Sequence, residues 1–232
     1  MDADAPDAVA AGTPVPAPAA GTRGRRLRPA GRIALILGLS VLFGAAMSWL
    51  KGDGPGLRDA IGNASAPWLL LPFLAGTAAG TRRIPLAAVT GLAATLAALA
   101  GFYVTNSVVL ALGPHPWLTD LGLTVRGGLY WFERGLLSGP VFGALGGWWG
   151  RSRSVAAAAA IAATFVLEPA AWWLYNLRIG GGAAYAVPQY PGLWLGEIAA
   201  GLAGFAALRT AGRKRPASRP AGPVLPRPRA GL

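Results

Sequence analysis

Six long apolar segments constrain the fold of this chain more than any other feature. They occupy residues 33–50, 66–81, 84–104, 128–149, 154–175 and 193–208. A helix needs about 20 predominantly apolar residues to cross the hydrocarbon core of a bilayer, and the second and sixth segments are on the short side of that length. The sequence therefore predicts an all-α protein, built as a six-helix transmembrane bundle.

The composition agrees with a membrane protein. Of all residues, 53% are hydrophobic and 13% are charged, whereas soluble domains average about 25% charged residues. The net charge of +12 raises the question of nucleic-acid binding. We exclude it, because the basic residues lie in tails and short loops rather than on a folded basic face. The expected surroundings are a lipid bilayer, with no nucleic acid as a partner.

Two segments without apolar runs flank the predicted membrane domain of residues 32–208. Residues 1–31 are rich in Ala, Pro and Arg, and residues 209–232 are rich in Pro and Arg. We predict that both are disordered cytoplasmic tails. The first apolar run, preceded by arginines, also fits a signal peptide. Its length and the bulky Trp49 at its end favour an uncleaved helix.

The distribution of basic residues predicts the orientation. With the N-terminus inside, sixteen Lys and Arg residues fall on the inner side and four on the outer side, which are Lys51, Arg58, Arg126 and Arg178. Basic residues concentrate in cytoplasmic loops of membrane proteins. We therefore expect a multi-pass protein of the cell membrane with both termini in the cytoplasm.

Three glutamates lie inside the apolar segments at a similar depth. In a helix, Glu133, Glu168 and Glu197 would each lie roughly 6–11 Å from the outer boundary, and Arg134 would lie at the same level. An ionisable residue in hydrocarbon costs about 2.5–3.5 kcal/mol, so such residues usually face the protein interior and one another. This pattern predicts an outward-facing polar site in which Glu168, Glu197 or both hold Arg134.

The fourth apolar segment adds two residues to this site. Arg126, Tyr130, Glu133 and Arg134 fall within about 100° on a helix. The predicted ligand-binding residues are therefore Glu133, Arg134, Glu168, Glu197, Tyr130 and Arg126. Two arginines against three glutamates leave one negative charge uncompensated. Either one glutamate is protonated, or a cation completes the site.

The same segment carries glycines at four-residue spacing. Gly139, Gly143 and Gly147 lie roughly opposite the polar residues, and small residues in this pattern allow another helix to approach closely. Pro140 leaves a backbone carbonyl unpaired and predicts a bend. We expect this helix to be central, with protein on both sides.

Little in the sequence points to catalysis. The chain has no Cys and one His, and that residue, His115, lies between two prolines. We therefore predict no metal site, no cofactor and no catalytic residue, and Ser138 is the one serine to test as a nucleophile. Most Trp residues map to the outer side, where they either anchor the helices at the interface or line the outer site.

Three motifs support a resemblance to known proteins. They are Ala66-Pro67-Trp68, residues 133–147 (ERGLLSGPVFGALGG) and Glu168-Pro169. With them the chain resembles small uncharacterised actinobacterial multi-pass membrane proteins, which have no assigned activity. In architecture it is also similar to the substrate-binding subunits of energy-coupling-factor vitamin transporters, although it carries no substrate signature of that family. That likeness implies six helices, both ends inside and an outward-facing site.

Three functions are compatible with these patterns. The leading hypothesis is a membrane protein that binds or transports a small polar or cationic solute at the outward-facing site. The second is a non-catalytic scaffold or partner subunit for another membrane protein, whose buried charges only lock helices together. The third is an intramembrane enzyme that uses the glutamates as acid and base.

Overall fold

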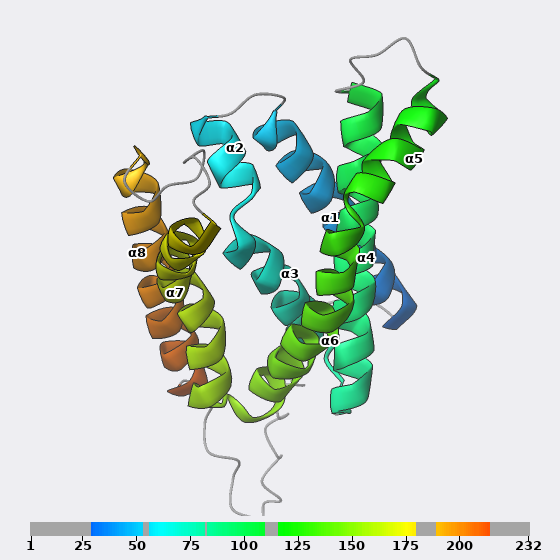
Figure 1. Cartoon of the computed structure of the whole chain (residues 1–232). Helices are drawn as coiled ribbons and strands as arrows, with labels where there is room; N and C mark the ends of the chain where they lie inside the picture. The colour runs from blue at the N-terminus through cyan, green and yellow to red at the C-terminus, as the bar shows by residue number, and fades with distance from the viewer. Residues whose placement is uncertain (1–28, 53–55, 82, 110–115, 180–188, 214–232) are drawn as a thin grey trace, which may run out of the picture.

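Helices make up nearly all of the described chain (Figure 1). The structure is a computed structural model that describes residues 29–52, 56–81, 83–109, 116–179 and 189–213. Within these ranges no strand occurs, so the predicted all-α class is confirmed. The helices are α1 (Pro29–Lys51), α2 (Leu57–Gly62), α3 (Ser65–Ala78), α4 (Ile84–Val109), α5 (Trp117–Gly127), α6 (Leu129–Ser152), α7 (Val155–Ile179) and α8 (Pro191–Arg213).

Each of the six predicted segments corresponds to a helix, and α2 and α5 fall in predicted outer loops. Four helices are long and apolar enough to cross a membrane: α1, α4, α7 and α8. The helix α3 has only 14 residues, so it is shorter than a full span. These helices are compatible with a membrane protein. The predicted tails fall largely outside the described residues.

Contacts between helix ends show how the chain runs back and forth. At one end of the bundle, Gly80 after α3 lies against Arg32 near the start of α1, and Gly212 near the end of α8 lies beside Arg153. At the opposite end, Lys51 at the end of α1 forms an ion pair with Asp59 of α2 at 3.4 Å. The helices α1, α3, α4, α6, α7 and α8 therefore alternate in direction (Figure 1).

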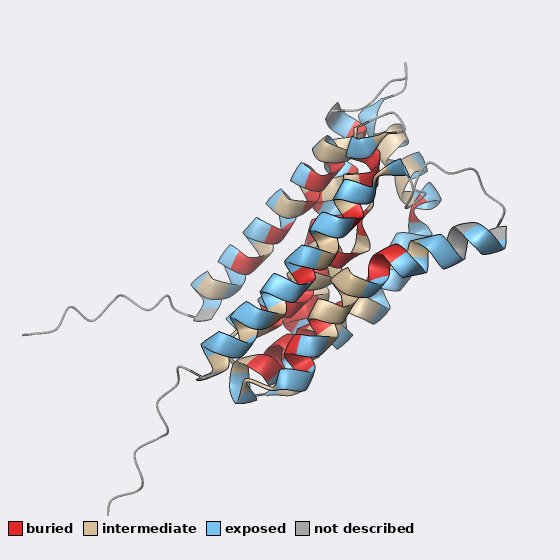
Figure 2. Ribbon diagram, turned by 90° about the vertical axis from the view of Figure 1, so that its left-hand side faces the viewer, coloured by how far each residue is buried: buried red, intermediate tan, exposed pale blue. Residues whose placement is uncertain are grey.

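The helix α4 is packed through small residues on two sides. Its Ala87, Ala94 and Ala98 are fully buried, and a side chain added at Gly44 of α1 would meet the backbone of α4 at Ala98. With so little side-chain volume between them, the helices approach to backbone contact. Figure 2 shows the buried residues along the inner faces of the helices, while the outer faces are exposed.

The predicted glycines of α6 lie against α4. Gly139, Gly143 and Gly147 are all buried. A Cβ added at Gly143 would lie 2.6 Å from the carbonyl oxygen of Ala87 and 2.8 Å from the Cα atom of Gly91. The next face of α6 packs on α3, where the Thr77 hydroxyl donates a hydrogen bond to the Gly146 carbonyl at 3.0 Å. The helix α6 therefore contacts protein on two sides.

The helix α7 bends where Pro169 interrupts its hydrogen bonds. Proline has no backbone N–H and its ring clashes with the carbonyl four residues earlier, which kinks a helix. Both Glu168 and Pro169 are buried at this point. The part of α7 that follows turns toward the viewer in Figure 1. The bend places Glu168 where α7 passes the start of α3.

Candidate functional site

An interruption between α2 and α3 forms the centre of the site. The helix α2 ends at Gly62 and α3 begins at Ser65, so that only Asn63 and Ala64 separate them. The Asn63 side chain donates a hydrogen bond to the Asp59 carboxyl group at 2.8 Å and another to the Asp59 carbonyl at 2.9 Å. These bonds close the end of α2. The start of α3 then lies inside the bundle rather than at its end (Figure 1).

The first backbone N–H groups of α3 bond to Glu168. A helix start leaves N–H groups without partners inside the helix. Ala64 donates to the Ile61 carbonyl at 3.2 Å, and Pro67 has no N–H to satisfy. The two between them, Ser65 and Ala66, both donate to the Glu168 carboxyl group, Ala66 at 2.6 Å. A carboxyl group at this position also meets the positive end of the helix dipole.

Glu168 is therefore the cap of a helix that lies over a hundred residues earlier in the sequence. It also accepts a hydrogen bond from the indole Nε1 of Trp172, one turn further along α7, at 3.2 Å. With three donors on its carboxyl group, Glu168 is only 6% exposed. Because a lost partner would leave buried N–H groups unsatisfied, this contact ties α7 to α3.

Glu197 on α8 lies level with Glu168 on α7. Gly201, one turn further along α8, packs against Phe165, one turn earlier on α7, and the two helices run antiparallel. Both oxygens of Glu197 are buried, and neither has a hydrogen-bond partner of good geometry among the described residues. Trp194, one turn earlier on α8, is 3% exposed. This side of the site is therefore an acid pair in a mostly apolar contact between two helices.

Arg134 lies elsewhere, on α6. Its guanidinium group stacks over the ring of Tyr130 at 3.8 Å, and its side chain is exposed. The expected ion pair with Glu168 or Glu197 is wrong for the described part of the chain. The helix α3 packs between α6 and α7 (Figure 1). Arg134 and the two glutamates therefore lie at a similar depth along their helices but on different sides of α3.

The other two predicted site residues, Glu133 and Arg126, contact neither the glutamate pair nor Arg134 in any described interaction. Glu133 is exposed on α6, and Arg126 is exposed near the end of α5. The six predicted residues are thus divided in two. Arg134 and Tyr130 lie together on α6, and Glu168 and Glu197 lie together between α7 and α8.

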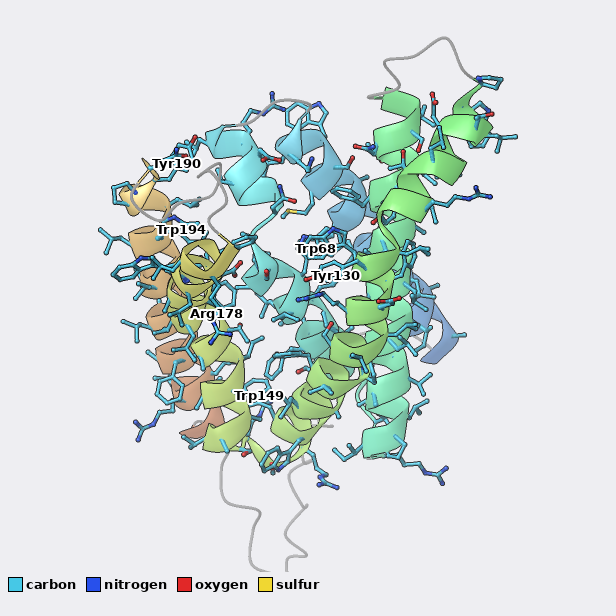
Figure 3. The ribbon with its side chains drawn as sticks, viewed as in Figure 1. Trp68, Tyr130, Trp149, Arg178, Tyr190 and Trp194 are labelled. Carbon is cyan, nitrogen blue, oxygen red and sulfur yellow. The ribbon has the colours of Figure 1, made fainter. Side chains whose placement is uncertain are left out.

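A cavity of about 470 Å³ lies between α3, α4 and α6. Pockets for small molecules typically have 300–1,000 Å³. Arg134 is the charged residue on its wall, and neither Glu168 nor Glu197 lines it. Ser65 lines it, so the cavity reaches the capped start of α3. Several aromatic residues complete the wall, among them Trp68, Phe102, Tyr103 and Trp131. Figure 3 shows Trp68 and Tyr130 facing the space between α3 and α6.

The comparison with protein families gives one result. Residues 23–222 match a family described as a family of unknown function (DUF6518). The chain belongs to the DUF6518 family. No curated protein and no solved structure matches the chain. The expected kinship with uncharacterised proteins agrees with this result, and the family has no assigned activity to transfer.

Sequence reasoning missed several residues of this DUF6518 site. Asn63 and Thr95 line the cavity, and the Tyr103 hydroxyl donates to the Gly128 carbonyl at 3.1 Å, which joins α4 to the start of α6. A signal for the helix interruption was present. Asn often ends a helix, and a Ser with a Pro shortly after it, as in Ser65-Ala66-Pro67, is typical of a helix start. Reading Asn63 to Pro67 in this way would have placed a helix end inside the bundle.

Proposed function

We propose that this DUF6518 protein is a six-span protein of the cell membrane that binds a small amphipathic organic anion in the cavity between α3, α4 and α6. The spans would be α1, α3 with α2, α4, α6, α7 and α8. Four of these helices are long and apolar enough for a span. The short α3 would cross together with α2, since the two cover residues 57–78 with a short interruption.

The ends of the helices support an orientation with both termini in the cytoplasm. The end of the bundle where α1 begins and α8 ends carries the basic residues Arg32, Arg83, Arg151, Arg153 and Arg209. The positive-inside rule assigns such an end to the cytoplasm. The cavity lies toward the other end, near Gly62 and Tyr103. It would therefore open toward the outside.

The proposal of an anionic ligand rests on Arg134, which has no acidic partner among the described residues. Arg134 also lies on the wall of the cavity. The Arg134 Cζ atom lies over the Tyr130 ring, 3.8 Å from its centroid, a position in which a guanidinium group commonly stacks by its flat face. Its edges, which carry the N–H donors, remain for a carboxylate or phosphate. A cationic solute, which the sequence also allowed, would meet the same charge as its own.

The rest of the wall indicates the body of the ligand. Large aromatic rings line the cavity from α3, α4 and α6, and Ser138 and Asn63 add a few polar groups. A mostly apolar pocket with a small number of polar groups is typical of sites for small organic molecules. An anion with a flat or apolar body would place its charge on Arg134 and its body against the rings.

Ligand binding to the purified full-length protein in detergent tests this proposal. We would measure tryptophan fluorescence and thermal stability with a panel of aromatic and aliphatic carboxylates, each paired with its neutral amide. The carboxylates should shift both signals and the amides should not. Arg134→Gln should weaken binding at least tenfold, and Arg134→Lys should weaken it less, since Lys keeps the charge but loses the planar donor pair.

The control is Arg126→Gln, an exposed arginine on α5 that does not line the cavity. It should bind like the unaltered protein. Equal effects of Arg126→Gln and Arg134→Gln would show that only overall charge matters. Binding of the amides as tightly as the carboxylates would contradict the anionic ligand. An anionic lipid headgroup as the source would appear as binding to lipids but not to soluble carboxylates.

A further inference from the structure

The contact between α7 and α8 brings two carboxyl groups together away from the cavity. Gly201 of α8 lies against Ala162 and Phe165 of α7, and because the two helices run antiparallel, Glu197 and Glu168 come level one turn further along. The two carboxyl groups differ in their surroundings. Glu168 has three hydrogen-bond donors: two backbone N–H groups of α3 and the Trp172 indole. Glu197 has none among the described residues, although both of its oxygens are buried. All the described donors that stabilise a negative charge therefore contact Glu168 and none contacts Glu197.

No described basic group compensates the pair. The helix α3 has no ionisable side chain. The other ionisable side chains described on α7, on α8 and directly before α8 are 7–12 residues away along the chain, which corresponds to about 10–18 Å in a helix. These are Arg178, Tyr190 and Arg209. The Arg209 Cζ atom lies over the Phe205 ring, 6.0 Å from its centroid, and Lys51 pairs with Asp59.

A second observation concerns the apolar wall around Glu197. Trp194 is 3% exposed, and its indole Nε1 has no described hydrogen-bond partner either. On the other side, Gly201 lets α8 approach α7 closely at Phe165. An unpaired negative charge in such surroundings is costly. Two carboxylates that share a site do not both ionise readily.

We propose that Glu197 carries a proton and donates it to Glu168, so that the two carboxyl groups form one proton-binding site between α7 and α8. A protonated carboxyl group supplies the donor that the geometry lacks. Glu168 then has its fourth hydrogen bond, and the pair carries one negative charge, held at the start of α3. The site binds one proton and releases it when the pair ionises fully.

The proton also determines whether α8 stays attached at this level. Within the described residues α8 packs mainly on α7, and α7 is tied to α3 by Glu168. Loss of the proton would place two negative charges side by side in the contact. We therefore expect α8 to loosen from α7 as the pH rises and the pair loses its proton.

Infrared spectroscopy of the purified full-length protein in lipid nanodiscs tests the proposal. A protonated carboxylic acid has a C=O stretching band that a carboxylate lacks. We expect this band at neutral pH in the unaltered protein, its loss in Glu197→Gln and its retention in Glu133→Gln, a matched change at an exposed glutamate of α6. A band that persists in Glu197→Gln, or no band at neutral pH, would overturn the proposal.

The pH dependence of thermal stability distinguishes a loss of the shared proton from a general loss of stability. Glutamine mimics protonated glutamate, because its amide donates one hydrogen bond to Glu168. The unfolded chain loses this proton at the pKa of a free glutamate, about 4.3, while the folded chain keeps it. Thermal stability of the unaltered protein should therefore fall with rising pH from that range up to the pH at which the pair ionises, and Glu197→Gln should lack that fall. An identical pH profile for both proteins would contradict the shared proton.

Chemical modification needs no variant. A hydrophobic carbodiimide reacts with protonated carboxyl groups in apolar surroundings, and mass spectrometry locates the adduct. The proposal expects modification of Glu197 at neutral pH and its decrease at alkaline pH. Modification of Glu133 with Glu197 untouched would overturn it.

Discussion

The backbone N–H of Ala66 donates a hydrogen bond to the carboxyl group of Glu168 at 2.6 Å, across 102 residues of sequence. Together with the neighbouring bond from Ser65, it satisfies the start of a helix that lies inside the bundle. Without Glu168 these N–H groups would need water or another acceptor in an apolar layer. Because α3 is short and begins inside the bundle, its first N–H groups need an acceptor there, and Glu168 supplies it.

Glu168→Ala should destabilise the protein by about 2–4 kcal/mol, because it removes a helix cap and leaves the buried N–H of Ala66 and the partly buried N–H of Ser65 without their acceptor. Glu168→Gln keeps one acceptor oxygen and should cost less. Reversible unfolding in mixed detergent micelles measures both. Glu133→Ala, at an exposed position of α6, is the control and should be close to neutral. A cost for Glu168→Ala no larger than that of the control would show that the cap contributes nothing.

Gly143→Ala should destabilise α6 against α4 by about 1–3 kcal/mol, which is the usual cost of overpacking. The added Cβ would lie 2.6 Å from the Ala87 carbonyl oxygen, whereas a Cβ at Gly127 would meet nothing within 4 Å. Gly127→Ala is therefore the matched control and should leave the melting temperature in detergent unchanged or higher. Equal behaviour of the two variants would mean that this helix contact is looser than described.

Arg134 and Glu168 should behave independently. They lie on opposite sides of α3 and share no contact, so Arg134→Met and Glu168→Gln should be additive within about 0.5 kcal/mol. A double-mutant cycle on unfolding free energies measures the coupling. A coupling above 1 kcal/mol would restore the ion pair that the sequence predicted and that the structure does not contain.

Cysteine labelling tests the orientation. The chain has no Cys, so single cysteines can be introduced cleanly. Gly122→Cys and Gly192→Cys lie at open, exposed positions on α5 and at the start of α8, and they should react with an impermeant thiol reagent on intact spheroplasts. Ser152→Cys, exposed at the opposite end of the bundle, should react only after lysis. Labelling of Ser152→Cys from outside would contradict the proposed topology.

The six long helices could be predicted from the sequence because a run of apolar residues is a local feature of the chain. Six apolar runs coincide with α1, α3, α4, α6, α7 and α8. The helix α2 has six residues and gave no signal of its own. The helix α5 is less apolar, and its sequence predicts a loop. A short or amphipathic helix depends on its neighbours for stability, so its own residues identify it poorly.

The candidate site could be predicted only in part, because depth along a helix does not determine position around the bundle. Glu168, Glu197 and Arg134 were correctly placed inside apolar helices. Their grouping was wrong, since it required knowing that α3 packs between α6 and α7. The role of Glu168 depended on the start of α3, and helix ends are the least certain feature of a sequence-based prediction.

The distance along the chain between α3 and its cap has a consequence for synthesis. Ser65 and Ala66 are made more than a hundred residues before Glu168, so the first turn of α3 has no cap when it leaves the ribosome. Until α7 has been translated and inserted, these N–H groups must stay hydrated or bind another acceptor. The final position of α3 is therefore reached late, and the last hairpin of the chain completes the folding of its first half.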